Sequence, residues 1–243
     1  MRADTQVRPN INGRVKFVTS TSPTKILAEA DRLYAGRRDI ANVQKSVELL
    51  RNAADCFEIS WRLARAFFFL GQEANAPDVA QRLHTEGVKA GQRAIAHQSD
   101  RVEGNFWLGV NLALLARLEP SIKAAKHALQ AKRVLRRAIQ IDATYHAAGP
   151  LRVLARLQHK LPRMLGGGPA RASGNFARAL SIAPTNTVTR IYLAELLVDT
   201  GDSDRARTEL ETILSAPFDP DWAFEIERDQ RLAAELIKKL PKT

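Results

Sequence analysis

Three basic residues stand at helical spacing in one stretch of the sequence, and side chains of this kind recognise anions. Arg152, Arg156 and Lys160 occupy positions i, i+4 and i+8 of a predicted helix at 147–161, with His159 beside them. Residues at this spacing share one face of a helix. Guanidinium groups bind carboxylates through paired hydrogen bonds, so the stripe predicts a site for a carboxylate-bearing ligand or peptide. The alternative is a solvated basic face that binds no ligand.

The surplus positive charge of the chain is confined to one quarter of the sequence. The 243 residues include 37 Lys and Arg and 26 Asp and Glu, which gives a net charge of +11. Residues 117–178 contain 13 basic and two acidic side chains, so this segment accounts for the whole surplus. Such a field attracts a small anion, an acidic peptide, a nucleic acid or an anionic membrane.

A repeated pattern of paired helices must position these side chains. In five predicted helices, positions i, i+4 and i+7 align as small, large and small residues or close variants of that pattern, which lets a neighbouring helix approach closely. The triplets are Ser46/Leu50/Ala53, Gly87/Gly91/Ala94, Ala131/Leu135/Ala138, Ala172/Phe176/Ala179 and Ala206/Leu210/Ile213. Successive triplets lie 41, 44, 41 and 34 residues apart. The pattern predicts an all-α, tetratricopeptide-like α-solenoid, a right-handed superhelix of about five helix pairs.

The chain divides into three predicted regions. Residues 1–23 form a flexible basic tail, residues 24–220 the repeat domain, and residues 221–243 a C-terminal capping helix. The last helix has apolar residues on one side and charged residues on the other, as the end of a stacked array requires. A partner-binding amphipathic helix is the alternative interpretation of this segment. The predicted helices span residues 24–34, 39–56, 58–71, 78–98, 102–118, 121–141, 147–161, 170–183, 187–200, 202–215 and 221–240.

The repeat pattern also predicts which side chains line the concave groove of the superhelix. They follow the packing positions of the first helix in each pair, which align on Leu63, Leu108, Leu154 and Leu193. The predicted groove residues are Trp61, Arg65, Phe68, Phe106, Val110, Arg152, Arg156 and His159. Aromatic side chains would supply an apolar floor, and the basic ones would bind the carboxylate of a ligand.

Three segments carry a resemblance to known families: WRLARAFFFLG (61–71), YHAAGPLRVLARLQHKLP (145–162) and LGGGPARASGNFARAL (165–180). They resemble the TRAP-transporter T-component family of periplasmic tetratricopeptide-like proteins and, more distantly, the regulator-of-microtubule-dynamics family. The resemblance covers roughly residues 24–240. It implies a helical, non-enzymatic protein that binds a solute or a partner and is associated with uptake of organic acids. Family members usually carry an export leader or a lipid-anchor cysteine, and neither stands in this sequence.

No motif in the sequence indicates catalysis, a cofactor or a metal. The run 166–168 lacks the Lys-Ser/Thr ending of a phosphate-binding loop, and the five histidines lack metal-ligand spacing. A wide turn between two packed helices is the preferred interpretation of these glycines. The single cysteine, Cys56, is expected to be a small buried residue.

We therefore expect a binding protein without cofactor whose partner is a protein, a peptide or a small organic anion. A cytoplasmic protein–protein adaptor is the alternative, and a nucleic-acid-binding repeat protein is disfavoured because no reading motif is present. No membrane-spanning segment stands in the sequence, so the chain as written is expected in the cytoplasm. A removed export leader, or a role like that of the T-component family, would place it in the periplasm.

Overall fold

The computed structural model describes residues 22–119 and 121–241, which form eleven α-helices and one short 3-10 helix, with no strand in this range. The all-α prediction is confirmed. Most of the predicted tail, residues 1–23, lies outside the described residues, and Pro23 already begins the first helix. The helices are α1 Pro23–Ala35, α2 Ile40–Arg51, α3 Phe57–Gln72, α4 Pro77–His97, α5 Val102–Leu118, α6 Ser121–Ile141, α7 Tyr145–Lys160, η1 Arg163–Leu165, α8 Pro169–Ile182, α9 Thr187–Asp199, α10 Ser203–Leu214 and α11 Ala223–Lys239.

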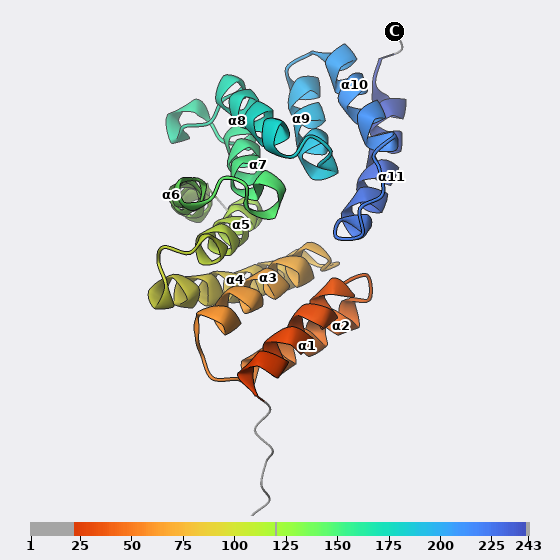
Figure 1. Ribbon diagram of the computed structural model, residues 1–243. Coiled ribbons are helices and arrows are strands. Elements are labelled where there is room, and N and C mark those ends of the chain that lie inside the picture. Colours follow the sequence, from red (N-terminus) through yellow and green to blue (C-terminus); the bar gives the residue numbers. More distant parts are fainter. Residues whose placement is uncertain (1–21, 120, 242–243) are drawn as a thin grey trace, which may run out of the picture.

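Consecutive helices pack as five pairs that stack into a curved array (Figure 1). The first helices of neighbouring pairs contact each other, as α3 contacts α5 and α5 contacts α7, and they form the inner, concave layer. The second helices, α2, α4, α6, α8 and α10, form the outer layer. Each outer helix also packs against the inner helix of the following pair, except that α10 packs against α11. The chain is thus a tetratricopeptide-like α-solenoid.

The small and large residues of the sequence pattern pack between the two layers. Ala172, Phe176 and Ala179 of α8 are fully buried, and the equivalent residues of α6 and α10 are buried in the same way. Gly91 shows why a small residue is needed, since a Cβ atom there would lie 2.8 Å from the Cβ of Leu108 on α5. Close approach of helices therefore selects the small side chains.

The glycine run after α7 forms the wide turn that the sequence predicts. Gly166 and Gly168 adopt positive φ angles of 78° and 127°, which glycine tolerates at little cost. A Cβ atom at Gly167 would lie 1.9 Å from the carbonyl oxygen of Leu161, so only glycine fits this position.

The expectation that Cys56 is buried is wrong. It is exposed because it precedes the first turn of α3 in an extended conformation.

The last helix does more than cover the end of the array. α11 packs against α9 and α10, and the chain around its start also reaches the turn between α1 and α2 (Figure 1). There Arg37 contacts Glu225 at 2.7 Å, and Phe224 lies 5.5 Å from Phe69 of α3, measured between ring centroids. The two ends of the superhelix are therefore joined. No described helix has the length and hydropathy needed to cross a bilayer.

Candidate functional site

The apolar residues predicted for the concave groove belong to the core of the inner layer. Trp61 of α3 and both Phe106 and Val110 of α5 are buried. Phe68 is half-buried and packs against Trp107, with 5.3 Å between the ring centroids. These side chains hold neighbouring inner helices together, because each of them fills space between α3, α5 and the helices beside them.

Arg65, the predicted cation of α3, has a partner inside the protein. Its Nη2 donates to Asp31 of α1 at 2.6 Å, and its guanidinium lies over the ring of Tyr34 at 3.9 Å. Arg62 donates to the same carboxylate at 2.8 Å. Desolvation opposes ionisation of Asp31, but the hydrogen bonds from both arginines outweigh it and lower the pKa of this carboxyl. Arg65 thus fastens α3 to α1.

The basic stripe of α7 faces acidic residues of α9, the next inner helix. Arg156 contacts Glu195 at 2.6 Å, and both His159 and Lys160 contact Asp199 at 2.8 Å. Desolvation and the neighbouring Lys160 lower the pKa of His159. The carboxylates relieve the repulsion between like charges along α7, and they tie α7 to α9.

Arg152 is buried, with 4% of its surface exposed. Its Nη1 donates to the carbonyl oxygen of Ala147 at 2.9 Å and to Oδ1 of Asn186 at 3.3 Å, and its Nη2 lies 3.3 Å from Nδ1 of His146. Burial lowers the pKa of this guanidinium to about 10. All these hydrogen-bond acceptors are neutral, and the carboxylates of Asp229 and Glu225 offset part of the buried positive charge.

Two of the residues that Arg152 contacts, His146 and Ala147, belong to a left-handed turn at the start of α7. His146, Ala147 and Ala148 have φ angles of 52°, 52° and 58°, a conformation that residues other than glycine rarely adopt. The prediction of an ordinary helical start at Ala147 is therefore corrected. The bonds from Arg152 and the following Gly149 and Pro150 hold the turn in place.

The left-handed turn presents His146 to the centre of the concave side, a position that the sequence did not indicate. His146 is exposed as a residue, but its ring packs among aromatic side chains and lies 5.4 Å from Phe106, 5.2 Å from Trp107 and 4.8 Å from Trp222 between centroids. Desolvation by the surrounding walls, followed by the charges of Arg152, Arg65 and Arg37, lowers the pKa of His146 to about 3. The imidazole is therefore neutral at physiological pH.

Most of the exposed basic side chains of residues 117–178 belong to the outer helices α6 and α8 and to η1. Of the 13 basic residues at 117–178, Arg156 and Lys160 are those that contact a carboxylate in the described part of the chain. We define the basic outer surface as the exposed Lys and Arg side chains of α6, η1 and α8, namely Lys123, Lys126, Arg133, Arg136, Arg137, Arg163, Arg171 and Arg178. Arg65, Arg156 and Lys160 of the inner layer are paired with carboxylates, whereas the side chains of the basic outer surface face solvent.

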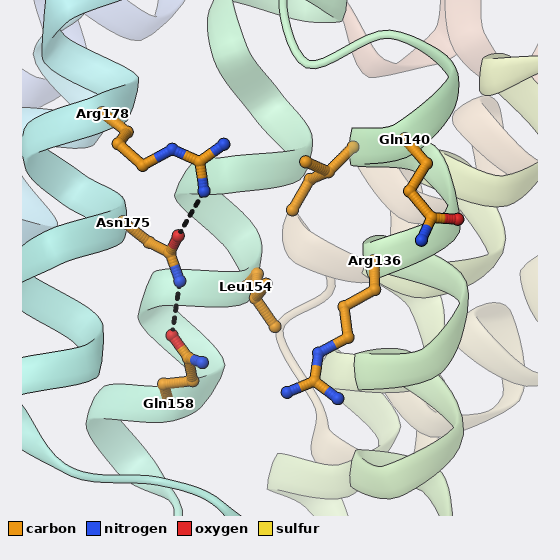
Figure 2. A pocket seen from close by; sticks show the side chains of 7 residues that line it. Arg136, Gln140, Leu154, Gln158, Asn175 and Arg178 are labelled. Carbon is orange, nitrogen blue, oxygen red and sulfur yellow. Dashed lines mark hydrogen bonds between the residues drawn. The ribbon is translucent and has the colours of Figure 1, made fainter.

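A groove opens within this surface between α6 and α8, with α7 as its floor (Figure 2). It has a volume of about 320 Å³ and is lined by Arg136, Ile139 and Gln140 of α6, Leu154 and Gln158 of α7, and Asn175 and Arg178 of α8. Figure 2 shows the guanidinium groups of Arg136 and Arg178 directed into it from opposite sides. We call it the α6–α8 groove.

A second groove, of about 390 Å³, occupies the equivalent place between α2 and α4, above α3. Its lining combines Arg51 and Arg82 with Glu48 and Glu86, and Arg51 lies 3.9 Å from Glu86. Acids and bases therefore offset each other in this groove, which distinguishes it from the α6–α8 groove.

The comparisons with known proteins agree with the fold. The crystal structure of a thermophilic TPR protein from Thermus thermophilus superposes with a TM-score of 0.63 at 21% identity, covering 85% of this chain and 98% of that one. A MamA mutant gives a TM-score of 0.47 at 14% identity, covering 79% of this chain and 97% of its own. The first likeness shows the tetratricopeptide fold. No curated protein matches the chain.

A match to a protein-family model identifies the family of this chain. The model described as regulator of microtubule dynamics protein 1-3 matches residues 26–241, which include all helices from α2 to α11 and most of α1. These comparisons do not support the T-component resemblance. The matched segment spans most of the sequence, and the chain belongs to the regulator of microtubule dynamics protein 1-3 family.

Proposed function

We propose that the chain is a non-catalytic scaffold that binds an acidic segment of a partner protein on its basic outer surface. The main supporting observation is that the exposed Lys and Arg side chains of α6, η1 and α8 have no carboxylate partner among the described residues, while the inner-layer cations Arg65 and Arg156 do. A surface with unmatched charge of one sign steers and orients a partner of the opposite sign. The helical-repeat fold supplies a rigid, extended face for such a partner.

The concave residues Trp61, Arg65, Phe68, Phe106, Val110, Arg152, Arg156 and His159 are the alternative site, for a small organic anion. A ligand carboxylate there would have to displace Asp31 from Arg65, Glu195 from Arg156 or Asp199 from His159. Each exchange gains little, because one carboxylate replaces another. The association with organic-acid uptake rests on the quoted T-component resemblance alone and remains a hypothesis.

The test compares two sets of charge reversals on the outer layer. Lys126→Glu, Arg133→Glu and Arg137→Glu change the basic outer surface, and Lys45→Glu, Arg82→Glu and Lys89→Glu make the same charge change on α2 and α4. Binding of fluorescein-labelled poly-L-glutamate is followed by anisotropy at two salt concentrations. We expect the first set to weaken binding at least about tenfold and the second about threefold or less, with the difference shrinking in high salt.

Two outcomes would overturn the proposal. Equal losses in both triple variants would show attraction by net charge alone rather than by this surface. Binding of duplex DNA without binding of poly-L-glutamate would identify a nucleic-acid-binding protein instead. Because the family's name refers to microtubule dynamics, microtubules are the first assembled partner to test by cosedimentation with the same variants.

A further inference from the structure

We infer that the α6–α8 groove anchors one carboxylate side chain, of Asp or Glu, together with a neighbouring apolar side chain of the acidic segment. The inference rests on the proposed function, and it identifies the groove as the main contact between the basic outer surface and the acidic segment. The groove offers hydrogen-bond donors above an apolar floor, a combination that matches a carboxylate carried on methylene groups. Its volume of about 320 Å³ suits one or two side chains rather than a large ligand.

Two hydrogen bonds within the groove engage the amide oxygens of Asn175 and Gln158. Arg178 Nη1 donates to Oδ1 of Asn175 at 3.3 Å, which fixes the orientation of that amide. Asn175 Nδ2 then donates to Oε1 of Gln158 at 2.8 Å (Figure 2). Each of these amide oxygens accepts one hydrogen bond, while the NH2 group of Gln158 and the remaining N–H groups of Arg178 and Arg136 are free to donate, so donors outnumber acceptors in the groove. The groove is complementary to an acceptor.

The position of these donors is held by the packing of α7. Gln158 is only 4% exposed, so the side chain at the base of the groove is fixed rather than free in solvent. Leu154 is buried one turn earlier, and half-buried Ile139 of α6 completes the apolar floor. A glutamate entering the groove would place its methylene groups on this floor and its carboxylate against the guanidinium group of Arg136 or that of Arg178, which lie well apart in Figure 2.

The arginines of the groove have no competing acid. No carboxylate in the described ranges lies within ion-pair distance of Arg136 or Arg178, whereas Glu86 lies near Arg51 in the equivalent groove between α2 and α4. A carboxylate ligand therefore displaces water from the α6–α8 groove, but it would compete with protein carboxylates in the other. Charge complementarity therefore favours an acidic occupant in the α6–α8 groove and not in the groove between α2 and α4.

The experiment measures binding of a labelled peptide made of four Glu-Glu-Leu repeats by anisotropy. The groove variant is Arg136→Gln with Arg178→Gln. One control, Lys123→Gln with Lys126→Gln, removes the same charge from the same surface, and another, Arg51→Gln with Arg82→Gln, removes it from the equivalent groove. We expect the groove variant to bind about tenfold more weakly or worse, and each control about threefold more weakly or less. Circular dichroism checks that every variant is folded.

The outcomes separate this inference from the proposed function. Equal losses in the groove variant and the Lys123/Lys126 control would refute the anchor site but leave the basic outer surface standing. Unchanged binding in both variants would refute the basic outer surface as the binding site and the α6–α8 groove as the anchor site. A peptide of Gln-Gln-Leu repeats that binds as well as the acidic peptide would rule out a carboxylate anchor. Tighter binding of a phosphoserine peptide, by tenfold or more, would replace the carboxylate with a phosphate.

Discussion

At the scale of single residues, the basic side chains of this protein divide into those that the fold uses and those that it leaves to solvent. Arg152 and Arg156 stand one turn apart on α7, yet the first is buried among carbonyl oxygens and the second pairs with Glu195. Position in the helix predicts their shared face, but only the neighbouring elements determine which groups they meet. Their contributions to stability should therefore differ.

Replacing Arg152 with methionine should destabilise the protein more than the same replacement of Arg156. Arg152→Met leaves buried carbonyl oxygens of the left-handed turn without a donor, and we expect a loss of about 3 kcal/mol. Arg156→Met removes a partly exposed ion pair, and we expect a loss of about 1 kcal/mol or less. Urea unfolding gives both values. Equal losses would show that Arg152 is not the group that supports the turn.

Three histidines with lowered pKa values should make stability depend on pH in a defined direction. Desolvation lowers the pKa of His84, His146 and His159 below the ordinary value of 6.5, for His146 to about 3. The folded protein therefore binds fewer protons than the unfolded chain, so the stabilisation is complete above pH 6.5 and is lost as the pH falls toward the folded pKa. We expect the free energy of unfolding to decrease from pH 7 to pH 5, a window above the range where most carboxyl groups titrate.

Two variants check that assignment. His146→Asn removes the titrating ring and suits the positive φ angle, so its stability should change less between pH 7 and pH 5 than that of the parent protein. Ser181→Asn, an uncharged replacement at an exposed position on α8, should keep the parent's slope. A parent-like slope in His146→Asn would mean that other groups produce the pH dependence.

At the scale of elements, the helices and their pairing follow from the periodicity of the sequence, while the start of α7 does not. An ordinary helix was expected to begin at Ala147. The structure instead places a left-handed turn there, with Arg152 and the neighbouring inner helices holding it. A local pattern of small and large residues contains no signal for such a turn, because its support comes from other parts of the fold.

Glycine substitutions should change the free energy of unfolding in opposite directions inside and outside this turn. Ala147→Gly relieves the cost of a positive φ angle and should stabilise the protein by up to about 1 kcal/mol. Ala177→Gly, at an exposed position within α8, should destabilise it by about 1 kcal/mol. Thermal and urea unfolding of both variants provide the comparison. Destabilisation by Ala147→Gly would show that the left-handed conformation carries no relievable strain.

At the scale of the whole molecule, contacts between the turn after α1 and the start of α11 close the superhelix. Arg37 and Glu225 lie 188 positions apart in sequence, and their side chains are 13% and 17% exposed. Arg37 also donates to the carbonyl oxygen of Asp221 at 3.0 Å. Nearby, Arg38 contacts Glu227 at 2.7 Å, but this second pair is largely exposed. The half-buried pair should therefore contribute more to closure than the exposed one.

Charge reversal tests the closure. Arg37→Glu should increase the radius of gyration measured by small-angle X-ray scattering and cost roughly 2 kcal/mol, and the exchange Arg37→Glu with Glu225→Arg should recover much of both. Arg38→Glu should destabilise the protein less than Arg37→Glu, since its ion pair is screened by solvent. If the exchanged pair recovers neither compactness nor stability, the ion pair does not hold the two ends together.

The sequence by itself determined the helices, their association in five pairs and the small residues at which they touch, because all of these depend on residues within one or two turns of each other. It also determined that residues 117–178 carry the surplus charge. The tertiary structure decided where that charge acts. Carboxylates on α1 and α9 bind Arg65, Arg156 and Lys160 of the inner layer, whereas the exposed cations of α6, η1 and α8 have no carboxylate partner among the described residues. The site, the position of His146 and the closure by α11 arise from side chains far apart in sequence, whose meeting no local pattern encodes.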